Sequence, residues 1–282
     1  MALPTFLGLG VPRGGTTWLH ALLSAHPAIV MPTKRKEVRF FDRYYGRGLG
    51  WYEGFFEVRG DGVLAVGEIS PQYLYCSACP GRIAASLPGV KLMVMLRHPL
   101  DRAYSQYGFV VQRGKFRGSF DEFLQSRPRA LEMGFYSTYL RAYLRVFDRA
   151  SLLPLVFEEV FADAAGAVAR VAEFLEVPQA GFDASSASTR VNASSTPSLG
   201  GASGLAVTVG RRLRRWGLEG VVDFGRRHGA RRAIASGRSL PRLDPEARAR
   251  LSRRYVDEFE ELERLLGLDL EIWRADVARS MR

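Results

Sequence analysis

Short apolar runs alternate with amphipathic segments along the first two thirds of the chain. Four runs combine small and branched apolar residues with few polar interruptions, at residues 6–11, 65–69, 91–96 and 152–156. Such runs are typical of strands in a parallel sheet that is covered on both faces. Helical spacing of apolar residues follows the strands, at residues 16–25, 136–147 and 164–175. The alternation predicts an α/β fold of three layers, with a central, mostly parallel sheet flanked by helices.

Terminal signals extend the helical assignments. Pro99 directly follows the third apolar run, where a first-turn proline predicts a helix toward Arg113. Ser119 and Glu122 have the spacing of a capping box. Near the C-terminus, an Asp-Pro pair and a later glycine predict one helix over residues 245–266, with Asp244 as N-cap and Gly267 as C-cap.

Composition excludes several classes of protein. The 282 residues are 47% hydrophobic and 24% charged, and two cysteines are too few for a disulfide framework. No apolar run approaches the ~18 residues of a membrane-spanning helix. The first residues lack a basic, apolar secretory leader, so we expect a cytoplasmic protein. Ten of the arginines lie between Leu199 and Leu243, and the rest of the chain is nearly neutral despite the net charge of +11. This distribution argues against nucleic acid as a partner.

A glycine-rich sequence joins the first apolar run to the first helix. It contains Arg13, Gly14, Gly15, Thr16 and Thr17. Glycines let backbone N–H groups converge at the helix N-terminus, where threonine hydroxyls add donors, so the pattern predicts a phosphate loop and a P-loop-like fold. The alternative is an ordinary glycine-rich turn, which does not require an arginine and two threonines together.

This loop differs from that of the nucleoside triphosphatases. Aligning Gly10 and Gly15 with the two glycines of G-x-x-x-x-G-K-[ST] places Thr16 where the lysine belongs. The strand at residues 91–96 is followed by Arg97 and not by a magnesium-binding aspartate. We therefore expect a second anion at this strand end and no metal. An ATP-dependent small-molecule kinase remains the alternative enzyme class.

Two motifs in order resemble the sulfotransferases that use 3′-phosphoadenosine 5′-phosphosulfate (PAPS). Arg13–Trp18 matches the loop [KR]-x-G-T-T-[WL], and Arg97–Ser105 matches R-[ND]-P-x-[DE]-R-x-x-S with His98 as a departure. The resemblance implies that Arg97 and Ser105 bind the 3′-phosphate and that no metal is required. It also implies that the 5′-phosphosulfate is bound by Arg13, Gly14, Gly15, Thr16, Thr17 and Trp18. Adenosine 3′,5′-bisphosphate would be the product.

Two further segments are similar to the heparan-sulfate branch of that family. Lys36–Asp42 is similar to K-E-x-H-F-F-D, which implies that Glu37 is the catalytic base and that Arg39, Phe41 and Asp42 contact the acceptor. Without the resemblance, Glu37 reads as a solvated loop carboxylate among basic residues. Gly67–Tyr73 is similar to G-E-K-[ST]-P-x-Y, but Ile69 stands where the family has a lysine. That lysine's role would then fall to Arg13 or to another cation.

The resemblance implies one sulfotransferase domain over residues 1–282. Its activity would be in-line transfer of the sulfuryl group of PAPS to a hydroxyl or amine of a small-molecule, glycan or peptide acceptor, with a carbohydrate as one candidate. Residues 178–241 match poorly and read as a loop and a basic helical segment, a candidate lid or acceptor-binding element. Within it, Arg211–Arg215 could contact an anionic acceptor, a membrane surface or the 3′-phosphate, or could be a solvated helical face. A non-catalytic polyanion-binding or membrane-binding module is the third hypothesis.

Three local features have two interpretations each. Trp18 could stack on adenine or belong to the core. The aromatic residues between 40 and 52 could line an acceptor cleft or pack a loop. Cys76 and Cys79 have redox-motif spacing without a partner motif, which suggests a local disulfide more than a metal site. The oligomeric state is not predicted.

Overall fold

The computed structural model describes residues 2–58, 60–182 and 243–279. By its contacts the chain divides into two compact units. The first comprises Met1–Ala103, Pro128–Val191 and Leu243–Arg282, and the second comprises Tyr104–Arg127 and Asn192–Arg242. Most of residues 178–241, and with them the basic segment Arg211–Arg215, lie outside the described residues. Of the helices that are described, none has the length and apolar character needed to span a membrane.

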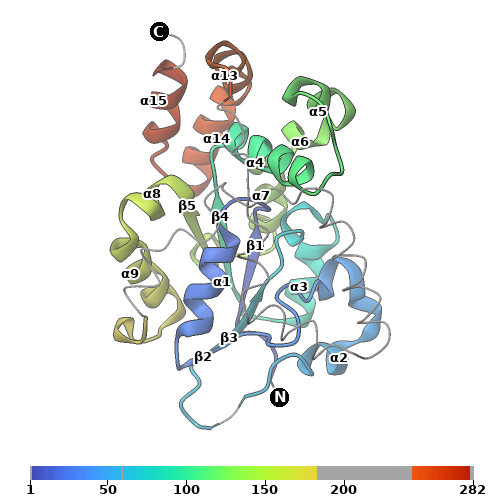
Figure 1. Ribbon diagram of the computed structural model, residues 1–282. Coiled ribbons are helices and arrows are strands. Elements are labelled where there is room, and N and C mark those ends of the chain that lie inside the picture. Colours follow the sequence, from blue (N-terminus) through green and yellow to red (C-terminus); the bar gives the residue numbers. More distant parts are fainter. Residues whose placement is uncertain (1, 59, 183–242, 280–282) are drawn as a thin grey trace, which may run out of the picture. The chain divides into compact units, whose positions relative to one another are not determined.

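A five-stranded parallel sheet is the centre of the first unit (Figure 1). Its strand order is β2-β3-β1-β4-β5, so the first long strand is central and later strands are added on either side. Phe6 of the central strand pairs with Gly67 on one side and with Lys91 on the other. The strands are β1 (Phe6–Gly10), β2 (Ile29–Val30), β3 (Ala65–Ile69), β4 (Lys91–Leu96) and β5 (Leu152–Val156). The predicted fold class and the four predicted strands are confirmed.

The three helices predicted from apolar periodicity are present, and the second of them ends at Leu144 and not at Phe147. The α-helices among the described residues of the first unit are α1 (Thr16–Ala25), α2 (Leu49–Glu53), α3 (Cys79–Ser86), α6 (Arg129–Glu132), α7 (Tyr136–Leu144), α8 (Phe157–Ala162), α9 (Ala164–Leu175), α13 (Pro245–Ser252), α14 (Val256–Leu266) and α15 (Glu271–Arg279). Helix α4 (Pro99–Gln112) begins in the first unit and continues into the second.

The single helix predicted over residues 245–266 is wrong in one respect. Its predicted caps are present, because the Asp244 carboxylate accepts a hydrogen bond from Ala247 N at 2.9 Å and Gly267 is left-handed with φ 62°. Between them, the 3-10 turn Arg253–Tyr255 divides the segment into α13 and α14. Apolar spacing continues through the turn, so the pattern did not reveal the break.

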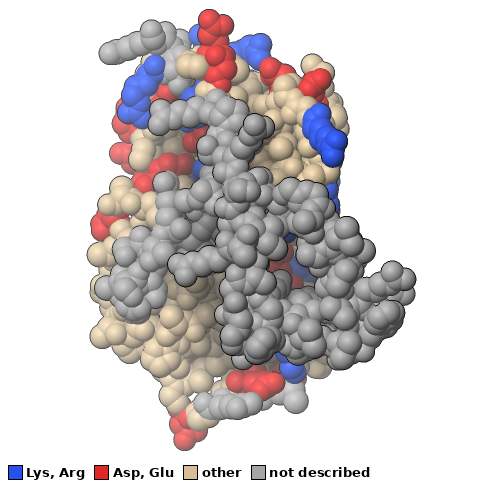
Figure 2. Space-filling view, in the orientation of Figure 1, with Lys and Arg blue, Asp and Glu red and all other residues tan. Residues whose placement is uncertain are grey.

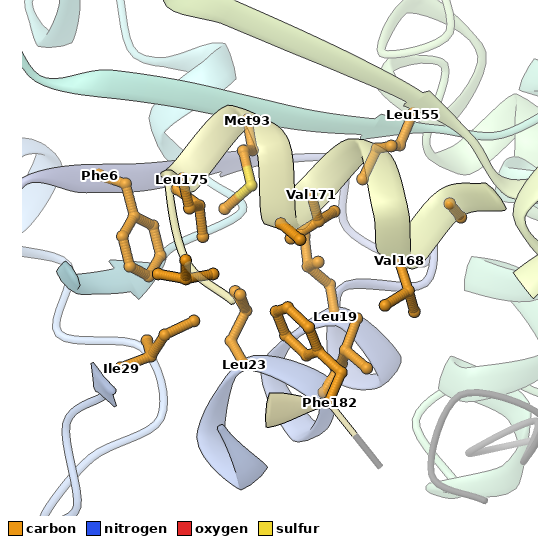
Figure 3. Close-up of a cluster of buried hydrophobic side chains, with 14 of the residues drawn as sticks. Phe6, Leu19, Leu23, Ile29, Met93, Leu155, Val168, Val171, Leu175 and Phe182 are labelled. Atoms are coloured by element: carbon orange, nitrogen blue, oxygen red, sulfur yellow. The ribbon is translucent and has the colours of Figure 1, made fainter. Parts of the chain in front are cut away.

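Helices α1 and α9 cover one face of the sheet (Figure 3). Leu19 and Leu23 of α1 meet Val171 and Leu175 of α9 over Met93 of β4, and all five are buried. Burial of each such side chain stabilises the fold by about 1.5–3 kcal/mol. This packing fixes the start of α1, and therefore the loop before it, against the sheet.

The C-terminal helices carry charges of both signs. Arg248 donates to Asp101 at 2.7 Å and to Asp276 at 2.5 Å, and Arg274 pairs with Glu263. Figure 2 shows acidic and basic side chains interspersed over the region where α13 and α15 lie in Figure 1. This mixed surface agrees with the nearly neutral balance of the chain outside residues 199–243.

The described part of the second unit contains most of α4 and the helix α5 (Phe120–Ser126). Its predicted capping box is confirmed: Ser119 N donates to Glu122 Oε2 at 2.6 Å, and Glu122 N donates to Ser119 Oγ at 3.2 Å. Tyr107 packs against Phe120 and Phe123, with ring centroids 5.5 Å apart in both pairs.

Candidate active site

The predicted phosphate loop leaves β1 at Gly10 and enters α1 at Thr16. Gly15 has a left-handed backbone with φ 99°, which glycine adopts without steric cost. A Cβ on Gly14 would lie 2.7 Å from the backbone oxygen of Met95, so the loop can lie this close to β4 only with glycine there. The first turn of α1 contains no acidic residue. The loop therefore presents the positive end of a helix without a neutralising carboxylate, as anion sites do.

Arg97 follows β4 and lies against this loop. Its Nη1 donates a hydrogen bond to the backbone oxygen of Arg13 at 3.2 Å, and its guanidinium lies over the Phe157 ring, 4.6 Å from the centroid. The Tyr136 hydroxyl donates to the Arg97 backbone oxygen at 2.8 Å. The two arginines that sequence analysis assigns to two anionic groups thus adjoin at the carboxyl ends of neighbouring strands. Ligands of parallel α/β sheets bind at such switch points.

The structure places Trp18 and Ser105, two of the residues predicted to bind the nucleotide, in different parts of the protein. Trp18 is 1% exposed in the hydrophobic core, where its ring meets Phe161 edge-on at 5.7 Å. This location favours the core interpretation over stacking of the ring on adenine, and a contact of Trp18 with the nucleotide stays a prediction. Ser105 lies on α4 within the second unit. Its contact with the 3′-phosphate stays a prediction.

The segment that carries Glu37 is fixed to the end of β3 by its backbone. Val38 N donates to Glu68 Oε2 at 2.9 Å, and Arg39 N donates to Ser70 Oγ at 3.0 Å. Arg39 has φ 60°, so the chain turns sharply directly after Val38. Glu37 therefore precedes a fixed turn, and its side chain is half-buried beside Lys36 and Arg39.

Glu68 is a fully buried carboxylate that the sequence analysis did not assign. It accepts four hydrogen bonds: at Oε1 from Tyr52 (2.7 Å) and Tyr73 (2.6 Å), and at Oε2 from Ser70 (2.6 Å) and Val38 N. Burial raises the pKa of Glu68, and the four donors oppose that shift. The signal in the sequence was a glutamate inside an otherwise apolar strand, since such a group needs partners when it is buried.

The expected acceptor contacts are only partly available. Phe41 is 0% exposed and packs against Tyr73 and Tyr52, which favours a packing role, and contact of its side chain with an acceptor stays a prediction. Asp42 forms an ion pair with Arg39. A third of the Arg39 side chain is exposed, and acceptor binding by this pair stays a prediction.

The aromatic segment divides into a buried and an exposed half. Phe40 stacks on Tyr52, with ring centroids 4.4 Å apart, and both are buried. Outside them, the Arg35 guanidinium lies 5.2 Å from the Tyr44 ring centroid, and Trp51 is partly exposed beside Tyr44. Both interpretations from the sequence therefore describe part of the cluster: the inner rings pack the loop, and the outer rings offer a basic aromatic surface.

Cys76 and Cys79 are both free thiols, so the suggested disulfide is wrong for this structure. Cys79 is buried at the start of α3, and burial raises its pKa. Within the described part of the chain, no three His, Cys, Asp or Glu side chains group together in a way that could hold a metal ion.

His98, the departure in the second motif, predicts acid sensitivity. Its side chain is buried against Phe259 and Trp273, and neither ring nitrogen has a hydrogen-bond partner among the described residues. Burial lowers the pKa of His98 from 6.5 to about 4. The unfolded chain then binds the proton more readily, so stability is complete above about pH 6.5 and is lost as the pH falls toward 4.

We expect the free energy of unfolding to fall by about 3 kcal/mol from this histidine across that window. His98→Phe should remove that part of the loss, and urea denaturation of both proteins at pH 7, 5.5 and 4.5 measures the difference. The other titrating groups are present in both proteins and cancel in the comparison. Identical pH dependence would contradict the prediction.

The parallel sheet with a glycine-rich loop between its central strand and α1 defines an α/β protein with a P-loop-like fold. The sequence pattern of the sulfotransferase domain matches residues 4–198. The chain belongs to the sulfotransferase domain family, and the resemblance inferred from the motifs is confirmed.

Individual relatives agree with this assignment. Heparan sulfate glucosamine 3-O-sulfotransferase 6 of Mus musculus is 33% identical over 180 residues, which cover 61% of this chain and 52% of the relative. Bifunctional heparan sulfate N-deacetylase/N-sulfotransferase 2 of Homo sapiens is 30% identical over 195 residues, which cover 62% of this chain and 22% of the relative. The chain thus spans about half the length of the first of these relatives and less of the second.

A sulfotransferase from Alicyclobacillus acidocaldarius, known from a crystal structure, has a TM-score of 0.70 to this chain at 24% identity. The match covers 97% of this chain and 100% of that one. It shows that the two proteins share a fold.

Proposed function

We propose that this protein transfers the sulfuryl group of PAPS to a hydroxyl or amine of an acceptor. The single observation that carries the proposal is the hydrogen bond from Arg97 to the backbone of Arg13. It joins a basic strand end to a phosphate loop, so two anionic groups of one ligand can be bound within a short span. A nucleotide with a 5′-phosphosulfate and a 3′-phosphate fits that requirement.

The roles of the residues follow from charge. Arg13 and the first N–H groups of α1 bind the 5′ end and stabilise the negative charge that develops on the leaving phosphate. Arg97 binds the 3′-phosphate. Glu37 accepts the proton of the attacking hydroxyl or amine. PAPS supplies the activated sulfuryl group. The chain's own residues bind and orient PAPS and the acceptor, and Glu37 takes up the acceptor's proton.

We infer a glycan as the class of acceptor. The matched relatives are named for heparan sulfate, and this chain carries a basic aromatic surface beside the Glu37 segment. In that surface Arg35 lies over Tyr44 and also 6.0 Å from the Phe55 ring centroid, and Arg43 lies 5.5 Å from Tyr44. Aromatic faces suit sugar rings, and guanidinium groups suit their carboxylate or sulfate substituents.

Nucleotide selectivity and transfer together test the function. Adenosine 3′,5′-bisphosphate should raise the melting temperature, whereas ATP with Mg²⁺ should not. Labelled PAPS should transfer its sulfuryl group to one member of a panel of glycans, peptides and phenols. Stabilisation by ATP with Mg²⁺ alone would favour a kinase, and equal stabilisation by any polyanion would favour a non-catalytic module.

Arg97→Met should remove the preference for a 3′-phosphate. A charge-assisted contact contributes about 1.5–3 kcal/mol, so the affinity ratio between adenosine 3′,5′-bisphosphate and adenosine 5′-phosphate should fall at least tenfold. Isothermal titration calorimetry measures both affinities. The exposed Arg145→Met is the matched control and should preserve the ratio. An unchanged ratio in Arg97→Met would contradict the assigned role.

A further inference from the structure

Lys36 links the phosphate loop to the segment that carries Glu37. Its Nζ donates a hydrogen bond to Thr17 Oγ1 at 2.7 Å, and Thr17 is the second residue of α1. The side chain is half-buried, unlike its neighbours Lys34 and Arg35, which are exposed. A basic residue in a run of four basic positions between 34 and 39 is therefore directed into the site and not into solvent.

The direction of this hydrogen bond has a chemical consequence. An ammonium group only donates, so Thr17 Oγ1 accepts from Lys36 and its own hydrogen remains available for another acceptor. Two further N–H groups of Lys36 are also available to donate. The contact thus presents a hydroxyl donor and a cation together, at a helix N-terminus that favours anions.

The charges around Lys36 place it between the groups assigned to donor and acceptor. The pKa of Lys36 is lowered chiefly by burial and further by Arg13, whereas Glu37 raises it. Arg13 belongs to the phosphate loop and Glu37 is the proposed base. Lys36 is therefore near both of these groups, and its hydrogen bond to Thr17 places its ammonium group at the start of α1.

The end of β3 offers no such cation. Ile69 occupies the position at which the resembled motif has a lysine, and its side chain is fully buried. The next two residues, Ser70 and Pro71, carry no positive charge either. Positive charge near the reacting group must therefore come from another segment, and the hydrogen bond to Thr17 holds Lys36 at the first turn of α1, directly after the phosphate loop.

We propose that Lys36 is a catalytic residue that binds an oxygen of the transferring sulfuryl group. The inference rests on the proposed function. In the step, the acceptor oxygen or nitrogen forms a bond to sulfur and loses its proton to Glu37. The bond between sulfur and the bridging oxygen breaks, and its electron pair stays on the 5′-phosphate. Lys36 remains protonated throughout and neutralises charge on the sulfuryl oxygens.

The alternative is that Lys36 only ties its segment to α1 through Thr17. Three substitutions separate the two roles. Lys36→Met removes donor and charge, Lys36→Gln keeps N–H donors without charge, and Lys36→Arg keeps both. Lys34→Met is the matched control, because Lys34 is 62% exposed and pairs with Glu57 at 3.5 Å.

The experiment measures kcat with PAPS and an acceptor, and measures binding of PAPS and of adenosine 3′,5′-bisphosphate by calorimetry without acceptor. We expect Lys36→Met and Lys36→Gln to lower kcat about 10²–10³-fold and Lys36→Arg to restore most of it. In both neutral variants, affinity for PAPS should fall about tenfold more than affinity for the bisphosphate, which lacks the sulfuryl group. Lys34→Met should match the wild type.

Two results would overturn the inference alone. The first is a wild-type kcat in Lys36→Gln, which would show that a neutral tether is enough. The second is an equal loss of affinity for both nucleotides, which would place Lys36 on the phosphate and not on the sulfuryl group. If the wild-type protein itself neither binds PAPS nor transfers its sulfuryl group, the proposed function fails and the inference with it.

Discussion

Glu37→Gln should lower kcat by about 10²–10⁴-fold while binding of adenosine 3′,5′-bisphosphate stays near the wild-type value. Glutamine preserves the size and the hydrogen-bonding oxygen but cannot take up the acceptor's proton. The backbone that positions residue 37 is fixed by neighbours, through Val38 N and Arg39 N, so the substitution should not displace the segment. Steady-state transfer from labelled PAPS and nucleotide calorimetry provide the two measurements.

A nearby carboxylate makes the comparison specific. Glu57 is 46% exposed and pairs with Lys34, so Glu57→Gln changes the same charge in the same region and should leave kcat unaltered. Glu37→Asp should give an intermediate rate, because the carboxylate is retained but its side chain is one methylene group shorter and lies farther from the acceptor. Normal turnover in Glu37→Gln would refute the assignment of this residue as the base.

Local pattern was sufficient to predict most of the fold. Buried parallel strands must be apolar on both faces, so Lys91–Leu96 and Leu152–Val156 were recognisable without their partners. The two-residue strand Ile29–Val30 was not recognisable, because its pairing with β3 and not its own sequence defines it. The break at Arg253–Tyr255 was missed because apolar residues keep their helical spacing through it.

The site was predictable where it is local and not where it joins distant segments. The phosphate loop is one strand–turn–helix unit, so its glycines and threonines identified it directly. The contact from Lys36 to Thr17 spans 19 positions and that from Val38 to Glu68 spans 30, and no sequence pattern encodes either. For Trp18 the local pattern and the motif disagreed. Its helical spacing with Leu19 and Leu22 indicated a core position, which the structure shows, whereas the motif match suggested stacking on adenine.

Glu68→Leu should be the most destabilising single substitution near the site. It would leave two tyrosine hydroxyls, the Ser70 hydroxyl and Val38 N without their acceptor in a fully buried place. Each unsatisfied buried donor costs about 1–3 kcal/mol, and rotation of the hydroxyls relieves part of the sum, so we expect a loss of about 3 kcal/mol or more in the free energy of unfolding. Chemical denaturation measures it. Tyr52→Phe, which removes one donor and keeps the carboxylate, should cost about 1 kcal/mol.

Glu68→Leu should also reduce turnover of the protein that remains folded, because Val38 N loses the carboxylate that fixes the turn after Glu37. Leu175→Ala supplies the matched control: Leu175 is buried between α9 and the sheet, and its truncation costs a comparable 2–5 kcal/mol without touching the Glu37 segment. At a temperature where both variants are folded by circular dichroism, kcat should fall in Glu68→Leu and stay near the wild-type value in Leu175→Ala. Equal kcat values in the two variants would mean that Glu68 stabilises the fold without positioning the base. They would contradict the claim that Glu68 of β3 positions Glu37 through Val38 N.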